Sequence, residues 1–164
     1  MAQQLVTGDE DARFWSKVIK GPRPDDCWLW TGAVSDDGYG RYWIKTSEGQ
    51  KALRPQRHAH TLLTGEQLSP DVILLHSCDA PLCVRSTGGP DSHTHPGTQA
   101  DNLMDRLQKR RHPHAYTWHW RSIGRTNFAA RSRQLRDALK AHGWDETIIR
   151  PLMSGHDPDA PRLF

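Results

Sequence analysis

Three cysteines and a histidine constrain the fold of this chain more than any other feature of its sequence. Cys78 and Cys83 are separated by four residues, and His93 follows ten residues after Cys83. Thiolate and imidazole groups at these spacings are typical of a tetrahedral zinc site, and Cys27 is available as the fourth ligand. Taken alone, Cys27 is more typical of a small core residue, but a site with three other protein ligands needs it. We therefore expect one closed, structural zinc ion per chain.

The composition is that of one domain with a thin core. A chain of 164 residues can bury one modest core, and a mean hydropathy of −0.78 indicates that this core is small for the length. A zinc ion would compensate for the small core. Three cysteines argue against a complete disulfide framework, and the sequence has neither a signal-peptide pattern nor an apolar run of membrane-spanning length. We expect a cytoplasmic protein with no membrane partner and with thiols that can bind metal.

The periodicity of apolar residues predicts an α+β chain. Strands are expected over residues 27–32, 38–44 and 71–75. The Asp37–Gly38 pair predicts that a hairpin turn joins the first two of them. Helices are expected over residues 9–19, 57–64, 99–109, 127–142 and 145–153.

The helix expected over residues 99–109 has the clearest start signal. Thr98 and Asp101 have the spacing of a capping box, with Asp in place of the usual Glu or Gln. Leu103, Met104 and Leu107 are expected to pack this helix inward.

Cations and aromatic residues are mixed after this helix. The segment from Arg106 to Arg136 contains Lys and Arg but no Asp or Glu, so the net charge of +3 hides a strongly basic region. Such mixing suits a nucleic-acid backbone, although the tryptophans could equally form a cluster on the core. The helices that follow could dock on DNA or mediate dimerisation. The candidate DNA contacts of this region are Lys109, Arg110, Arg111, Arg121, Arg125 and Arg131.

An ordered set of short motifs resembles the His-Cys box homing endonucleases, a branch of the HNH or His-Me finger nucleases, and related bacterial and phage HNH proteins. Each motif is weak alone, whereas the order of the whole set is specific and extends over residues 13–110. The matching pieces are Cys27-Trp28-x-Trp30-x-Gly32, Gly38-Tyr39-Gly40, a helix from Arg57 to Gly65, His76-x-Cys78, Cys83 and Gly97-Thr98-x-x-Asp101-Asn102.

This resemblance implies a zinc-stapled ββα-metal (His-Me finger) core with a preceding antiparallel sheet and C-terminal helices. It divides the chain into a nuclease domain over residues 9–112 and a basic helical extension over residues 113–164. The segment after Cys83 departs from the family, because it is longer and lacks an Asn-Pro pair. Counting back from Gly97 places the fourth zinc ligand at His93 rather than His95. A second zinc cluster, present in some members, is not expected, since all three cysteines are already used.

The resemblance also implies a role for three further residues. His76 would be the general base, because an imidazole titrates near neutrality. Asn102 would bind a catalytic Mg²⁺ through its amide oxygen, which is a suitable ligand for a hard ion. Arg57 would contact the scissile phosphate, and Asp101 is assigned to the helix cap. Outside the motif, His76 would be an ordinary histidine at a strand end, Asn102 a helix-cap residue and Arg57 a surface cation in an ion pair.

Taken together, the resemblance implies a metal-dependent endonuclease that cleaves double-stranded DNA at specific sites, of the homing or restriction type, in a bacterial or phage setting. One active site per chain implies a homodimer for double-strand cleavage. The alternative is a zinc-stabilised DNA-binding protein without catalysis. An RNA-directed nuclease is disfavoured, because nothing in the sequence resembles an RNA-binding module.

Overall fold

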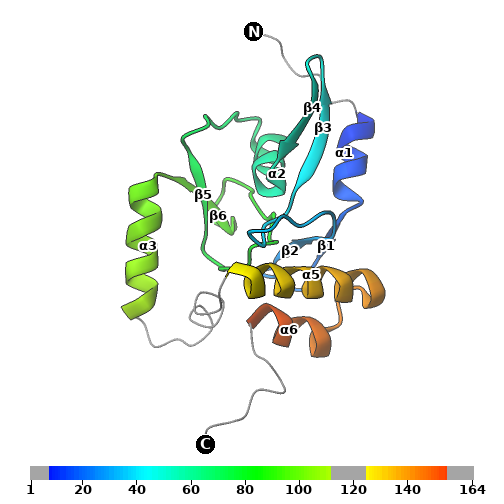
Figure 1. Cartoon of the computed structure of the whole chain (residues 1–164), viewed down its shortest axis with the longest axis vertical. Helices are drawn as coiled ribbons and strands as arrows, with labels where there is room; N and C mark the ends of the chain where they lie inside the picture. Colours follow the sequence, from blue (N-terminus) through cyan, green and yellow to red (C-terminus); the bar gives the residue numbers. More distant parts are fainter. Residues whose placement is uncertain (1–7, 112–124, 155–164) are drawn as a thin grey trace, which may run out of the picture.

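Three two-stranded antiparallel sheets and five helices make up the described part of the chain, which comprises residues 8–111 and 125–154 of a computed structural model (Figure 1). The predicted α+β class with small antiparallel sheets is confirmed. In chain order the elements are α1 (Gly8–Trp15), β1 (Val18–Lys20), β2 (Trp28–Trp30), β3 (Tyr42–Thr46), β4 (Gly49–Leu53), α2 (Pro55–Thr64), β5 (Ile73–His76), β6 (Thr94–Gly97), α3 (Gln99–Arg111), α5 (Arg125–His142) and α6 (Glu146–Ser154).

The chain changes from helix to strand earlier than the sequence predicts. We expected one helix over residues 9–19, but α1 ends at Trp15 and the next residues form β1. β1 pairs with β2 in antiparallel register, with Val18 opposite Trp30 and Ile19 opposite Leu29. Valine and isoleucine are β-branched and favour an extended, paired strand over a helix. The prediction of a longer helix was therefore wrong.

The predicted hairpin between residues 27–32 and 38–44 was also wrong, although its turn forms. Within the turn, the backbone N–H of Ser35 donates to the carbonyl of Tyr39 at 2.9 Å. β2 does not pair with β3, because β1 occupies one of its edges and residues 82–84 occupy the other. On that second edge the N–H of Val84 donates to the carbonyl of Trp28 at 2.8 Å. β3 pairs with β4 instead.

The remaining predicted helices are confirmed, and their ends have clear physical causes. α2 ends before Gly65, whose φ of 73° is the left-handed conformation that glycine adopts readily. α3 begins with the predicted capping box. The backbone N–H and the hydroxyl of Thr98 donate to the carboxylate of Asp101 at 2.7 and 2.8 Å, and the N–H of Asp101 donates back to Thr98 Oγ1 at 3.2 Å.

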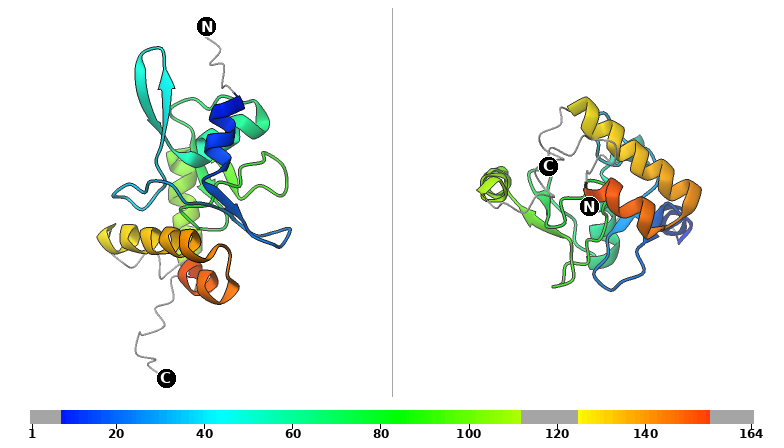
Figure 2. Two further views of the ribbon diagram at one scale, coloured as in Figure 1. Left: turned by 90° about the vertical axis from the view of Figure 1, so that its right-hand side faces the viewer. Right: turned by 90° about the horizontal axis from the view of Figure 1, so that it is seen from below.

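One buried cluster joins the first and last described helices. The ring of Phe14 in α1 lies between 4.9 and 5.4 Å from the rings of Trp30, Tyr42 and His58, measured between centroids. α5 and α6 lie side by side in Figures 1 and 2 and close over this cluster. They add three fully buried aliphatic side chains to it, Leu135, Leu139 and Ile149. The described helices of the predicted C-terminal extension therefore share a core with the preceding region.

α3 is packed less than the sequence predicts. Leu103, Met104 and Leu107 are 57%, 54% and 39% exposed, so the prediction that they face inward was wrong. The main neighbour of α3 is β5, and Figure 1 shows the helix standing at the outer side of the β5–β6 pair. Its apolar side chains therefore have no element of the described chain to cover them. Within residues 8–111 and 125–154, no helix combines the length and the apolar character that a bilayer span requires.

Candidate metal centre

The four predicted zinc ligands converge on one point. The Sγ atoms of Cys27, Cys78 and Cys83 and a ring nitrogen of His93 all lie within 4.8 Å of one another. Nδ1 of His93 is 3.5 Å from Sγ of Cys27 and 3.6 Å from Sγ of Cys83. A tetrahedral zinc ion with Zn–S bonds of about 2.3 Å and Zn–N bonds of about 2.0 Å requires an S···N separation of about 3.6 Å. The side chains are therefore spaced to hold a zinc ion.

Strand ends and tight backbone hydrogen bonds position these ligands. Cys27 immediately precedes β2, and Cys83 forms a bridge with Leu29 in the middle of that strand. Cys78 follows β5 and His93 precedes β6, so the β5–β6 pair brings these two ligands together. The N–H of Ser77 donates to the carbonyl of His93 at 2.9 Å and closes this end of the pair.

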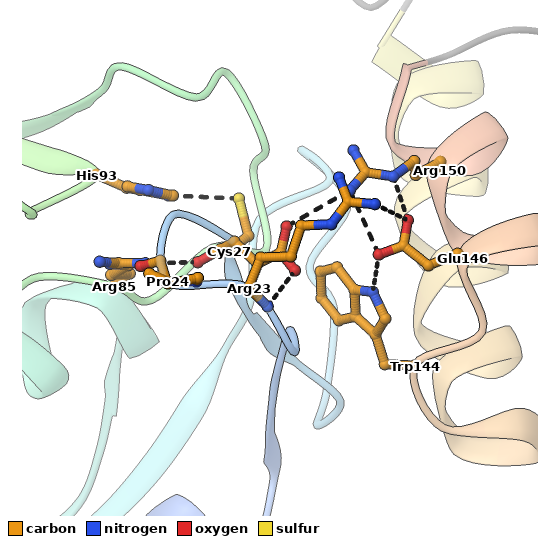
Figure 3. Close-up of polar contacts among 9 residues, drawn as sticks. Arg23, Pro24, Cys27, Arg85, His93, Trp144, Glu146 and Arg150 are labelled. Carbon is orange, nitrogen blue, oxygen red and sulfur yellow. Dashed lines mark hydrogen bonds and ion pairs between the residues drawn. The ribbon is translucent and has the colours of Figure 1, made fainter.

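A buried arginine fastens the two loops that carry the ligands. Arg85 is only 6% exposed, and its guanidinium donates to the carbonyls of Pro24 and Asp26 at 2.5 and 2.9 Å. Its other terminal nitrogen contacts the carboxylate of Asp91 at 3.3 Å. Figure 3 shows the contact of Arg85 with Pro24 beside the Cys27–His93 pair, and Arg150 of α6 reaches the loop before β2 through Asp26. The ligand loop before β2 is thus tied both to the loop before β6 and to the C-terminal helices.

The pKa values of the three thiols are shifted in different directions. Burial would raise the pKa of Cys83, but hydrogen bonds from Cys27, Cys78 and the backbone N–H groups of Arg85 and Trp28 outweigh it and hold that pKa well below the usual value. A hydrogen bond from Cys27 likewise lowers the pKa of Cys78, while donating to both partners raises the pKa of Cys27. The surroundings of Cys78 and Cys83 therefore favour the thiolate, which is the form of cysteine that binds a metal ion.

The structure supports His93 over His95 as the fourth ligand. His95 pairs with Leu75 across the β5–β6 register, is exposed, and does not belong to the ligand group. The long segment after Cys83 does not disturb the site, because the N–H of His93 donates to the carbonyl of Arg85 at 2.9 Å and returns the chain to the cluster. Among the described residues, this is the one group of three or more His, Cys, Asp or Glu side chains arranged to hold a metal.

The same unit carries His76 and Asn102. β5 and β6 pair with His76 opposite Thr94, and α3 follows two residues after β6, so the three elements form a ββα unit. His76 is half-buried, and its Nδ1 lies 4.0 Å from Sγ of Cys78. Asn102 is half-buried in the first turn of α3, where its N–H donates to the carbonyl of Thr98 at 3.0 Å.

Two neighbouring groups have roles in positioning the unit. The carboxylate of Asp101 accepts the backbone and hydroxyl hydrogen bonds of Thr98, which lower its pKa, as expected for the cap that we assigned to it. The guanidinium of Arg57 donates to the carbonyls of Val72, Leu68 and Ser69, the last two at 3.0 and 2.9 Å. Arg57 therefore fastens the loop that leads into β5, and its predicted phosphate contact stays a prediction.

The predicted DNA contacts of the basic segment are placed only in part. Arg131 is half-buried on α5. Arg121 lies outside the described residues. Lys109, Arg110 and Arg111 belong to the end of α3 and Arg125 to the start of α5, and their side chains also lie outside what the structure describes.

Sequence reasoning missed two groups that border the site. The first is a buried series of hydrogen-bonded side chains. Ser86 Oγ lies 3.1 Å from Nδ1 of His60 and accepts a hydrogen bond at 2.6 Å from Thr94, which is the residue opposite His76 in the β5–β6 pair. No local signal predicts this series. The ring of Tyr39 lies 6.1 Å from that of His76, and here the Gly-Tyr-Gly motif was an available signal.

Comparison with known proteins gives two relatives from one virus. Over 87 residues the chain is 33% identical to protein 7.7 of Escherichia phage T7, and over 90 residues it is 32% identical to protein 2.8 of the same phage. The matches cover 53% and 55% of this chain, and 59% and 55% of the two relatives. The chain thus spans little more than half the length of the curated relatives it matches. No protein-family model matches the chain. No solved structure matches it either.

Proposed function

We propose that this chain is a metal-dependent DNA endonuclease of the His-Me finger type. The observation that carries the proposal is the ββα unit of β5, β6 and α3, which bears His76 at a strand end and Asn102 in the first helical turn, with three of the four metal-binding residues between them in the sequence. A protein that only binds DNA needs the zinc-binding group but has no need for the histidine or the asparagine at these positions.

His76 is proposed as the general base that activates the attacking water. An imidazole serves this purpose near neutral pH, because it can accept a proton without being permanently charged. The zinc group would do no chemistry but would hold the strand end of β5 in place through Cys78.

Asn102 is proposed as the protein ligand of the catalytic divalent ion. The fit is chemical: the half-buried amide offers a neutral oxygen, and the neighbouring Asp101 is occupied by the helix cap. When bound, Mg²⁺ would offset the charge that develops on the leaving oxygen. A single neutral protein ligand predicts weak metal binding in the absence of DNA, because phosphate oxygens and water must fill the other positions.

Double-stranded DNA is the proposed substrate, and a homodimer is the proposed cutting form. The basic stretch from Arg106 to Arg136 supplies cations for phosphate contacts. Each chain carries one His76 and one Asn102, so cleavage of both strands requires two copies or two successive events. The resemblance favours site-specific cutting of the homing or restriction type, and the relatives from Escherichia phage T7 agree with a phage setting.

A plasmid-cleavage assay tests the proposal. Supercoiled plasmid incubated with the zinc-loaded protein and Mg²⁺ should be nicked or linearised, and EDTA added just before the substrate should stop the reaction. His76→Ala should abolish cleavage while DNA binding and one bound zinc per chain remain. His95→Ala is the matched control, because this exposed histidine lies on the neighbouring strand outside the zinc group.

Two outcomes would contradict the proposal. Cleavage by His76→Ala at the rate of the unchanged protein would remove the histidine from the mechanism. DNA binding without cleavage under any divalent ion would favour the zinc-stabilised DNA-binding protein without catalysis.

A further inference from the structure

Tyr39 is the aromatic neighbour of His76. The centroids of the two rings are 6.1 Å apart and their planes are tilted by 49°. The other sides of the Tyr39 ring contact Phe128 of α5, at 6.1 Å between centroids, and the guanidinium of Arg54, at 5.2 Å. Separations of 4.5–7 Å between ring centroids are those of favourable aromatic pairs. Tyr39 therefore lies between the proposed base and the C-terminal helix.

The turn that presents Tyr39 leaves its backbone little freedom. Gly38 has a φ of +82°, and a Cβ added there would lie 2.3 Å from the ring of Phe128. A Cβ added to Gly40 would lie 2.7 Å from the side chains of Pro55 and Trp30. Both glycines are required by close approach, so α2, β2 and α5 all press on the backbone that carries Tyr39.

An ion pair fixes the cation that covers Tyr39. Arg54 donates to the carboxylate of Asp37 through both terminal nitrogens, and to Ser35 Oγ at 3.0 Å. The N–H of Tyr39 donates to the same carboxylate at 3.2 Å. Arg54, Asp37 and Tyr39 thus each contact the other two, and each restrains the positions of the others.

A base at the end of a strand needs such restraint. His76 is the last residue of β5, and its Nδ1 lies 4.0 Å from Sγ of Cys78, so the ring of Tyr39 adds a second contact that can set the orientation of the imidazole. We propose that Tyr39 is a positioning residue that holds the imidazole of His76 in its working orientation, and that Phe128 acts behind it. This inference rests on the proposed nuclease function, which it deepens by making α5 part of the catalytic apparatus.

Substitutions at Tyr39 separate positioning from other roles. Tyr39→Phe keeps the ring and should retain kcat, whereas Tyr39→Leu should lower kcat by between about 10-fold and 100-fold, the cost of misplacing a catalytic group. KM for plasmid DNA and the zinc content should not change in either variant. An equal loss of kcat in Tyr39→Phe would overturn the proposal, because the hydroxyl and not the ring would then carry the effect.

A double-mutant cycle tests the link to α5. Phe128→Leu should lower kcat less than Tyr39→Leu, and the double variant should be no slower than Tyr39→Leu alone, since both changes act through one contact. Multiplicative losses of kcat would show independent effects and would remove Phe128 from the path to His76.

A spectroscopic measurement keeps this inference separate from the nuclease proposal. In carbon–proton spectra of the zinc-loaded protein, the ring resonances of His76, assigned with His76→Gln, should move in Tyr39→Leu and much less in Tyr39→Phe. Trp43→Leu is the control, because it removes an aromatic ring from the neighbouring strand β3 and should leave those resonances unchanged. A protein that never cuts DNA but shows the shift would contradict the function alone. Unmoved resonances in Tyr39→Leu would contradict the positioning role, whether or not the protein cuts DNA.

Discussion

At the scale of single residues, the amide of Asn102 gives a sharp test of divalent-ion use. Asn102→Ala should lower cleavage by about 100-fold or more, because it removes the only protein ligand that we assign to the ion. Measuring the rate against Mg²⁺ concentration should also show a higher concentration needed for half-maximal cleavage. Gln108→Ala is the matched control, since it removes an exposed amide from the same helix. Equal losses in the two variants would indicate a general effect on α3.

His58 gives the fold a dependence on pH. Its ring is buried against Phe14 and Tyr42, and burial lowers its pKa against the opposing effect of Glu10 and Asp11. The unfolded chain binds a proton near pH 6.5, whereas the folded protein resists it. The stability that the neutral ring contributes is therefore present above about pH 6.5 and is lost as the pH falls toward the lower folded pKa.

His58→Phe should flatten this dependence. Between about pH 7 and pH 5, the free energy of unfolding should decline less steeply in the variant than in the unchanged protein. Urea denaturation with zinc in excess measures this difference, and the exposed His142→Phe is the control. Parallel declines in all three proteins would show that other groups set the pH dependence.

At the scale of elements, a leucine of α5 and a leucine of α3 should contribute very different amounts to the free energy of unfolding. Leu139 of α5 is buried in the common core, whereas Leu103 of α3 is mostly exposed. Leu139→Ala should cost about 2–5 kcal/mol of unfolding free energy, because it leaves a cavity. Leu103→Ala should change it by less than about 0.5 kcal/mol. Denaturant unfolding measures both free energies of unfolding. A large loss of stability in Leu103→Ala would mean that α3 is covered in solution.

Local signals account for the elements that the sequence predicted well. Gly65 and the Thr98–Asp101 capping box fix helix ends through contacts within a few residues, and such patterns can be recognised from sequence alone. The metal-binding group was predicted partly for a similar reason, since the short spacings of Cys78, Cys83 and His93 indicate a shared metal, whereas Cys27 was added as the missing fourth ligand and His93 was preferred to His95 through the family motif.

Long-range pairing accounts for the errors. The choice between β1 and β3 as the partner of β2 depends on residues 82–84, which occupy the second edge of β2 from far along the chain. The contact of Tyr39 with His76 likewise depends on α5 pressing on the turn through Phe128. No local pattern encodes the partner of β2, and the Gly-Tyr-Gly motif singles out Tyr39 without indicating what its ring contacts, because both arrangements are decided by which surfaces meet in the folded protein.

At the scale of the whole molecule, removing the metal should affect the folded state and the proposed activity together. The core is small, and the zinc group joins β2 to the ββα unit. Structural zinc sites contribute on the order of 10 kcal/mol to folding, so a strong chelator should abolish cooperative thermal unfolding. Circular dichroism with metal analysis measures this, and Cys83→Ser should behave like the chelated protein, whereas His95→Ala should retain one zinc. An unchanged melting curve after complete zinc removal would contradict a structural role.

The positions of the four ligands along the chain also bear on how the protein is made. Fifty residues lie between Cys27 and Cys78, so a metal ion bound at this group would close a loop that contains most of the first half of the sequence. The entropy of closing such a loop grows only slowly with its length, but closure must wait for the distant partners to emerge. On a translating ribosome the site cannot be completed until His93 has left the exit tunnel. Zinc binding at this group would therefore join Cys27 to the three later ligands only after that stage of synthesis.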